Sequence, residues 1–285
     1  MTLTGLYVPL ITPFDSSGAV ALDALESLAR RVLSEGAAGL VALGTTGEPS
    51  SLTEAERQAV IDVATRVCRE HHAQLLVGAS TPDTLEDLRA RADAALTVVP
   101  PFVRPGEAGA VAYLTQLAAN SPVPLVIYHV PYRTGQPLSA DSLRQLAALP
   151  NVIGVKYAAG ITEETIALVA DLPPDFAVLG GDDLFISPLL ALGAHGAILA
   201  SAHLETTRFA QLIHAWQTGD LTTARSLGHR LSRLSKALFA EPNPTVIKAT
   251  LHAHGLIPTP DVRLPLLPAT PTSLDAALLT HPVPA

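Results

Sequence analysis

Cysteine is nearly absent from this 285-residue chain, in which Cys68 is the only one. A single thiol excludes an intramolecular disulfide and any zinc site built from several cysteines. The N-terminus lacks the charged region and the long apolar segment of a signal peptide. Apolar stretches such as Ala197–Ala202 are far shorter than the roughly 20 residues that span a bilayer. We therefore expect a cytoplasmic protein that is not embedded in a membrane.

Basic residues are also few. Lysine and arginine total 18 against 26 aspartates and glutamates, which gives a net charge of −8. This balance argues against a nucleic-acid partner, because such a surface requires clustered basic side chains. The ten histidines do not cluster at metal-ligand spacings, so we expect neither a metal nor another cofactor. Only three lysines occur, Lys156, Lys236 and Lys248, which draws attention to any of them in an apolar setting.

Short apolar runs alternate with amphipathic stretches along most of the chain. The apolar runs are nearly continuous, which is typical of parallel strands covered by helices. Eight strands are expected, at Leu6–Ile11, Gly39–Leu43, Gln74–Ala79, Leu96–Val99, Pro124–Tyr128, Val152–Lys156, Ala177–Leu179 and Gly196–Ala200. Helices are expected at Leu22–Glu35, Glu54–Glu70, Thr84–Ala92, Glu107–Ala119, Ala140–Leu149, Thr162–Asp171, Asp183–Leu192 and Thr206–Thr218.

Eight βα units in succession favour an α/β fold of the closed (β/α)8, or TIM, barrel type. The alternative is an open Rossmann-type sheet. It is disfavoured because the first βα turn, Thr12–Asp15, has no glycine-rich phosphate loop. We expect residues 1–218 to form the catalytic barrel and residues 219–285 to form a C-terminal helical extension.

The expected extension contains two helices, at Leu221–Ala240 and Pro244–Gly255. From Pro258 onward the chain is rich in proline, and we expect this tail to lie on the surface. No linker long enough to separate a second globular domain is evident.

Reactive groups of such barrels lie at the C-terminal ends of the strands. Lys156 ends the sixth apolar run with no acidic neighbour in sequence. Desolvation there would lower the pKa of its ammonium group and free the amine to attack a carbonyl. The alternative is a lysine that reaches solvent or pairs with a distant carboxylate. Tyr128 ends the fifth run and points to the same mouth, where its phenol either transfers protons or closes the core.

Several loop residues join these two at the barrel mouth. Gly44–Gly47 offers two hydroxyls and several backbone amides, which suit a carboxylate, although such turns are often purely structural. Arg133 either grips a second carboxylate or is an ordinary surface arginine. Asp182 and Asp183 follow the seventh strand, where a helix N-cap is a simpler explanation than a cation site. For His129, a core or loop role is expected.

In chain order these pieces resemble the dihydrodipicolinate synthase / N-acetylneuraminate lyase family, over nearly the whole chain. Each motif alone is weak, whereas the ordered set is specific. The motifs are Val8–Phe14, Gly44–Glu48, Tyr128–Pro131, Gly154–Lys156 and Gly180–Asp183. The resemblance implies a class I aldolase, which forms a Schiff base with pyruvate.

The resemblance also implies a role for each matching residue. Lys156 forms the imine with pyruvate, and Tyr128 is the proton donor. Thr45 belongs to a proton relay, whereas Thr46 binds the pyruvate carboxylate. Ile198, in the eighth strand, presents its backbone to the bound pyruvate. The family's fold further suggests a homotetramer built as a dimer of dimers.

Features of the synthase branch are present. Arg133–Gly135 resembles the segment whose arginine holds the carboxylate of the aldehyde substrate. Glu241–Pro244 followed by Lys248, and the later Arg263–Pro265, resemble the C-terminal segment of the synthases. We therefore expect a lyase that condenses pyruvate with an aldehyde acid, namely aspartate semialdehyde, in lysine biosynthesis.

Three departures point away from an ordinary synthase. Phe102 stands where the family carries a relay tyrosine that is supplied across the dimer interface. The stretch Thr84–Ala92 is short for the third helix, and Tyr157 follows Lys156 where synthases usually have an acid. One alternative is a retro-aldol lyase of a 2-oxo-3-deoxy sugar acid or a related 4-hydroxy-2-oxo acid. Another is a ligand-binding paralogue without turnover.

Overall fold

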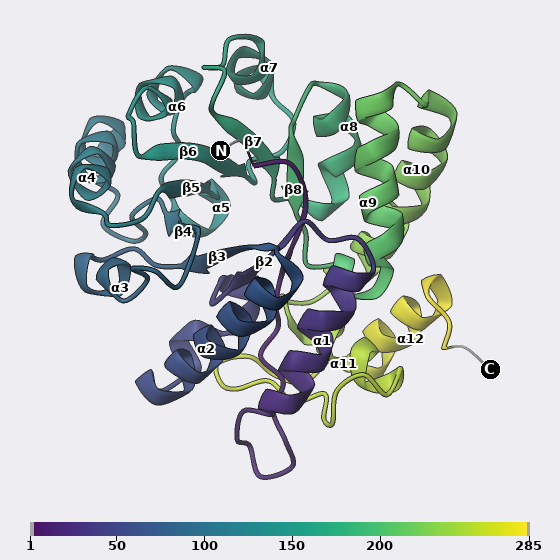
Figure 1. The fold of residues 1–285 in the computed structure, drawn as a ribbon. Helices are drawn as coiled ribbons and strands as arrows, with labels where there is room; N and C mark the ends of the chain where they lie inside the picture. Colours follow the sequence, from purple (N-terminus) through teal and green to yellow (C-terminus); the bar gives the residue numbers. More distant parts are fainter. Residues whose placement is uncertain (1–2, 284–285) are drawn as a thin grey trace.

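Eight parallel strands form a closed barrel in the computed structural model, which describes residues 3–283. The strands pair in chain order and β8 returns to β1, so the expected (β/α)8 barrel is confirmed. Figure 1 shows the strands at the centre with the helices arranged around them. The strands are β1 Gly5–Pro9, β2 Gly39–Ala42, β3 Gln74–Gly78, β4 Ala94–Val98, β5 Leu125–His129, β6 Val152–Tyr157, β7 Ala177–Gly180 and β8 Gly196–Ile198.

Helices connect each strand to the next and cover the outside of the barrel. The apolar side chains that face outward from the strands pack against these helices in one continuous core. A smaller core fills the barrel interior. The helices are α1 Leu22–Ser34, α2 Glu54–His71, α3 Pro82–Glu86, α4 Gly106–Asn120, α5 Pro131–Thr134, α6 Ala140–Ala147, α7 Glu163–Ala170, α8 Ile186–Ala191 and α9 Ala202–Thr218.

Local sequence explains where these helices begin and end. Thr53 caps α2, because its hydroxyl accepts from the backbone N–H of Glu56 while the Glu56 carboxylate accepts from the backbone N–H of Thr53. Gly219 ends α9 in the left-handed conformation, at a φ of 78°, which glycine adopts without steric cost.

The third helix differs from the expected Thr84–Ala92. It starts earlier because Thr81 caps it and Pro82 occupies its first position, where proline is well tolerated. It ends at Glu86, and the chain continues as turns in which Ala90 has a φ of 59°. The α5 turn after β5 was also not expected, since a helix of four residues leaves no periodic pattern in a sequence.

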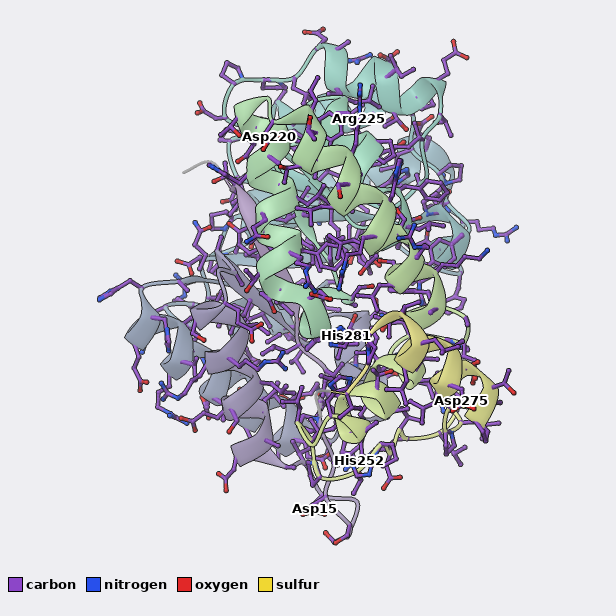
Figure 2. All side chains as sticks on the ribbon, turned by 90° about the vertical axis from the view of Figure 1, so that its right-hand side faces the viewer. Asp15, Asp220, Arg225, His252, Asp275 and His281 are labelled. Atoms are coloured by element: carbon purple, nitrogen blue, oxygen red, sulfur yellow. The ribbon has the colours of Figure 1, made fainter. Side chains whose placement is uncertain are left out.

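Three helices form the C-terminal extension: α10 Leu221–Leu238, α11 Thr245–Ala253 and α12 Pro271–Thr280. The first two were expected, whereas no helix was assigned to the Pro-rich tail from Pro258 onward, which was expected to lie on the surface and contains α12. Thr270 caps α12 and Pro271 is its first residue, so the start signal was present among many prolines. Figure 2 shows α10 beside α9, with His281 near the lower ends of these helices and α12 below them.

The extension is packed onto the barrel rather than detached from it. Helix α10 lies along α9, and α12 packs against both α10 and α11. Across residues 3–283, no helix is both long and apolar enough to pass through a membrane.

Candidate active site

Lys156 lies near the C-terminal end of β6, inside the mouth of the barrel. It stands in register with Tyr128 of β5 on one side and Leu179 of β7 on the other. Only 7% of Lys156 is exposed, and its Nζ lies 4.3 Å from the centre of the Tyr128 ring. The two side chains therefore meet in the mouth, as their positions at the ends of neighbouring strands predict.

Burial lowers the pKa of Lys156 to about 8, because desolvation disfavours the ammonium form. The Asp183 carboxylate opposes this shift. Within the described part of the chain, Lys156 forms no ion pair with a carboxylate. Gly181 makes room for the lysine, since a Cβ there would lie 2.7 Å from Lys156 Cγ and 2.8 Å from Cε.

Asp182 and Asp183 have different surroundings. The Asp182 carboxylate accepts a hydrogen bond from the backbone N–H of Leu184 at 3.2 Å, which is the expected N-cap. Asp183 is buried, and its Oδ2 accepts from the backbone N–H of Ser201 at 2.7 Å. Burial raises the pKa of Asp183 to about 6, while hydrogen bonds from Ser201 and the charge of Lys156 counter the rise. Asp183 lines the same cavity as Lys156, at the strand end where the sequence places it, but as a buried carboxylate and not as the cap residue.

A tight turn after β2 carries Thr45 and Thr46. Leu43 enters it with a φ of 52°, in the left-handed region. The carbonyl oxygen of Leu43 lies very close to Gly78. A Cβ added at residue 78 would be only 2.1 Å from that oxygen. The short 3-10 helix Thr45–Gly47 follows. A glycine in the neighbouring strand thus permits the approach of the loop that presents both threonines.

Both threonines lie at the cavity wall. The Thr46 hydroxyl accepts from the Asn243 side-chain amide at 2.9 Å. Burial raises the pKa of the Tyr128 phenol, and the charge of Arg133 and a hydrogen bond with Thr45 counter that rise. Thr45 and Tyr128 line the same cavity, whereas Thr46 is held by a residue of the C-terminal extension.

Arg133 comes from α5, where Pro131 begins a single helical turn and Gly135 ends it at a φ of 69°. Its Nε donates to the Tyr132 hydroxyl at 2.8 Å. Tyr132 itself is 71% exposed. Both side chains line the cavity that contains Lys156. The loop after β5 therefore places the Arg133 guanidinium at the outer side of this cavity.

An inner and an outer space share wall residues at the mouth, and a third space of about 250 Å³ adjoins the inner one at Tyr132, Gly181 and Asp183. The inner one measures about 30 Å³, and its wall includes all the expected site residues except Phe102. The outer one, about 760 Å³, extends along the loops after β2 and β3 toward the C-terminal extension. Residues that line both the inner and the outer space are Thr45, Tyr128, Arg133 and Asn243.

Ile198 and Phe102, the other expected site residues, lie in opposite surroundings. Ile198 is buried in β8, in register with Tyr7 of β1, and lines the inner cavity. Phe102 is 89% exposed and has a φ of 67° in the loop after β4. Within one chain it is not part of the cavity wall.

His129 follows Tyr128 but is buried away from the cavity. Its ring centroid lies 5.4 Å from that of Tyr157. Burial lowers the pKa of His129 to about 4, only partly offset by the charge of Glu107. It is therefore a neutral core residue, as expected. In the part of the chain that the structure describes, no group of three or more His, Cys, Asp or Glu side chains is arranged to hold a metal ion.

Fold and site together define a (β/α)8-barrel enzyme whose mouth contains a buried amine, a phenol and a hydroxyl-bearing loop. Residues 2–278 match the model of the dihydrodipicolinate synthetase family. The chain therefore belongs to this family, and the resemblance seen in its motifs is confirmed.

Individual relatives agree with this assignment. The chain is 34% identical to 4-hydroxy-tetrahydrodipicolinate synthase 2 of Clostridium acetobutylicum over 275 residues, covering 94% of this chain and 96% of that protein. It is 37% identical to the 4-hydroxy-tetrahydrodipicolinate synthase of Thermosynechococcus vestitus over 278 residues, covering 94% and 92%.

Solved structures agree as well. Dihydrodipicolinate synthase of Thermotoga maritima superposes with a TM-score of 0.94 at 27% identity, covering 98% of each chain. The chloride-inhibited dihydrodipicolinate synthase of Acinetobacter baumannii, complexed with pyruvate, gives 0.92 at 33% identity, covering 99% of this chain and 100% of that one.

Sequence reasoning did not identify two residues of the cavity wall, Asn243 and Phe239. Both belong to the segment that follows α10 and precedes α11. Only the resemblance drew attention to this segment, because nothing local in the sequence shows that it returns to the barrel mouth.

Proposed function

We propose that this protein condenses pyruvate with aspartate semialdehyde, as a 4-hydroxy-tetrahydrodipicolinate synthase, through an imine on Lys156. The observation that carries the proposal is the arrangement around the buried amine. Lys156, Tyr128, Thr45 and Thr46 open onto one inner cavity, and the pKa of Lys156 is lowered to about 8. The names of the relatives support the choice of substrates.

In the first step the neutral amine of Lys156 attacks C2 of pyruvate and forms a carbinolamine. Its hydroxyl then leaves as water after it receives a proton, and the C=N bond of the imine forms. Tyr128 supplies that proton, because the centre of its ring lies 4.3 Å from the amine and it lines the same cavity as Thr45. Such positioned proton donors typically contribute about 10²–10⁴-fold to a rate.

The carboxylate of pyruvate binds at the turn after β2. The Thr46 hydroxyl accepts from Asn243 and is therefore left with its own proton to donate. Backbone amides of the same turn add further donors, and the backbone of Ile198 flanks the substrate on the β8 side. The inner cavity, about 30 Å³, is much narrower than the outer space of about 760 Å³, so the smaller substrate, the 2-oxo acid, is assigned to the inner one.

The Tyr128 phenolate left by the first step takes a proton from C3 and turns the imine into an enamine, whose C3 attacks the aldehyde carbon of the second substrate. The new C–C bond forms as the aldehyde oxygen takes up a proton. Arg133 reaches both the inner and the outer space, so its guanidinium is placed to hold the carboxylate of an aldehyde acid by two hydrogen bonds. The outer space, about 760 Å³, receives this substrate.

The assembly that we propose is a homotetramer built from dimers. Phe102 and Val103 are 89% and 78% exposed in one chain, and exposed apolar loops of this kind fit a subunit interface. A monomeric variant of dihydrodipicolinate synthase is among the structural neighbours, so a monomer is the alternative. Light scattering of the purified protein decides between the two.

A substrate assay tests the function. Purified protein is given pyruvate and aspartate semialdehyde, and consumption of both is followed together with the cyclic condensation product. We expect stoichiometric loss of the two substrates. Cleavage of 4-hydroxy-2-oxo acids or 2-oxo-3-deoxy sugar acids without condensation would move the protein to the retro-aldol alternative. Absence of turnover with every compound, despite pyruvate binding, would indicate the non-catalytic paralogue.

A further inference from the structure

A buried ion pair joins the C-terminal extension to the loop that carries Thr45 and Thr46. Lys248 of α11 is fully buried, and its Nζ donates to Oε1 of Glu48 at 2.8 Å. Glu48 is the residue that follows the Thr45–Gly47 turn, and only 5% of it is exposed. The partners are 200 positions apart in the sequence.

Both oxygens of the Glu48 carboxylate are used by the extension. While Oε1 accepts from Lys248, Oε2 accepts from the backbone N–H of Arg263 at 2.9 Å. The ring of Phe14 lies 4.0 Å from Lys248 Nζ and 4.3 Å from Cζ of Arg263. This arrangement leaves little water around the charges, and an ion pair in such a place resists rearrangement because breaking it would strand a buried charge.

Glu48 also holds an unusual backbone conformation. Its φ is 53°, in the left-handed region that L-residues seldom adopt. Two neighbouring contacts fix the same turn, because Thr12 donates to the carbonyl of Gly47 at 2.8 Å and Asn243 donates to Thr46 at 2.9 Å. The turn is therefore held at successive residues, and the Glu48–Lys248 pair is the charged contact among them.

The extension wraps around this end of the molecule. Thr259 donates to the carbonyl of Phe14 at 2.8 Å, and the Arg263 guanidinium binds the Glu56 carboxylate. Figure 2 shows His252 of α11 and Asp15 of the β1–α1 loop at the same end of the molecule. The position of the Thr45–Thr46 turn thus depends on chain segments from both ends of the sequence.

We propose that Glu48 and Lys248 are positioning residues that set the affinity for the 2-oxo acid by holding the turn in its carboxylate-binding geometry. The inference rests on the proposed function, because it takes this turn to be the carboxylate site. A purely structural pair would affect stability alone. A positioning pair also affects the pyruvate concentration needed for half-maximal imine formation, and that effect persists when stability is restored.

Three variants separate these cases: Glu48→Gln, Lys248→Met and the double variant. Each is measured by thermal unfolding and by the pyruvate concentration that gives half-maximal borohydride trapping. Each single variant leaves one buried charge or polar group without its partner and is expected to unfold at a lower temperature. The double variant has no stranded charge, so its unfolding temperature returns toward that of the parent. Its half-maximal pyruvate concentration is expected to stay raised by about tenfold, the effect of roughly one lost hydrogen bond to a charged group.

Glu205→Gln is the matched control. Glu205 is also a mostly buried glutamate that binds the extension, through Arg230 of α10 and His281. None of its partners belongs to the turn after β2. We expect this control to unfold at a lower temperature with its half-maximal pyruvate concentration unchanged.

The outcomes are distinct. A double variant whose half-maximal pyruvate concentration lies within twofold of the parent would overturn the inference. So would a control that weakens pyruvate trapping as much as the pair variants do. If a single variant does not fold, the double variant decides; if the double variant does not fold, whichever single variant folds is compared with the control. A parent protein that pyruvate and borohydride do not label at all would instead refute the proposed function.

Discussion

Two lysines are buried in this barrel, and their surroundings differ. Lys248 donates to the Glu48 carboxylate at 2.8 Å inside the contact between α11 and the turn after β2. Lys156 faces an open cavity and the ring of Tyr128, and in the described structure it forms no ion pair. Burial lowers the pKa of both ammonium groups. Under the proposed function, burial alone does not make a lysine reactive: Lys156 opens onto a cavity and, within the described residues, has no directly paired carboxylate, although Asp183 lies on the same cavity wall.

Replacing each buried lysine with methionine should give the largest expected effects: Lys156→Met lowers turnover, whereas Lys248→Met lowers stability. Lys156→Met removes the amine that forms the imine, and we expect turnover to fall by at least about 10⁴-fold, as when a catalytic nucleophile is removed. Stability should be retained or increased, because a desolvated amine without a directly paired carboxylate among the described residues has been replaced by an apolar chain. Lys248→Met should lose about 3–5 kcal/mol of stability, because it strands a buried carboxylate, while keeping turnover at saturating pyruvate within a few-fold.

Steady-state kinetics and chemical denaturation of the two variants check this contrast. Equal losses of turnover in both would remove the distinction between a reacting and a pairing lysine. A stable Lys248→Met protein would show that the Glu48 carboxylate finds another partner or takes up a proton.

Removing the Tyr128 hydroxyl tests whether this residue transfers protons beside Lys156. Tyr128→Phe keeps the ring beside Lys156 but cannot donate a proton. We expect turnover to fall by roughly 10²–10⁴-fold, while pyruvate still labels Lys156 slowly. Single-turnover trapping separates the rate of imine formation from its extent. Unchanged turnover would remove Tyr128 from the proton transfers and leave it as a core residue.

Arg133→Ala probes the outer space. We expect KM for the aldehyde acid to rise by about tenfold, since a charge-assisted pair of hydrogen bonds is lost, with pyruvate trapping intact. Arg144→Ala, on α6, is the control, because its partners, Asp141 and the carbonyl of Ala167, lie outside both cavity walls. Unchanged KM in the Arg133 variant would show that the loop after β5 does not recognise the second substrate.

Phe102→Tyr should give the smallest effect, and it tests the missing relay hydroxyl. Phe102 lies outside the cavity of its own chain, so it reaches a site only across a subunit interface. We expect pyruvate trapping to be unchanged and condensation with aspartate semialdehyde to rise at least several-fold. A parent enzyme that gains nothing from the hydroxyl would show that water or another group, such as Tyr132, completes the relay. No synthase activity before or after the change would favour the retro-aldol alternative.

The barrel was predictable because parallel strands leave continuous apolar runs that helical stretches separate. All eight strands lie within two residues of their expected bounds. The α12 helix was not predicted, since its packing against α10 and α11 is a tertiary effect and prolines dominate the local signal. The domain boundary at residue 218 and the cytoplasmic location stay predictions.

Most of the candidate site could be predicted from which residues stand at the C-terminal ends of strands. Lys156 and Tyr128 met in the mouth because register and barrel closure place neighbouring strand ends together. Asp183 was expected at the mouth, but as part of a helix cap and not as a buried carboxylate in the cavity of Lys156. Asn243 could not be found in this way, because it reaches Thr46 from 197 residues away. Contacts of that separation depend on how the extension folds back, which no local pattern encodes.

Pyruvate trapping by borohydride, mapped to individual lysines and followed against pH, tests the central claim most directly. The account predicts a stable adduct on Lys156 and none on Lys248 or Lys236. Since the amine must be neutral to attack, and burial lowers the pKa of Lys156 to about 8, the rate at limiting pyruvate should rise with pH and level off above 8. The neutral fraction at pH 8 exceeds that at pH 6 by roughly 50-fold. A label on Lys248 or Lys236, or an unlabelled Lys156 at every pH, would contradict the account.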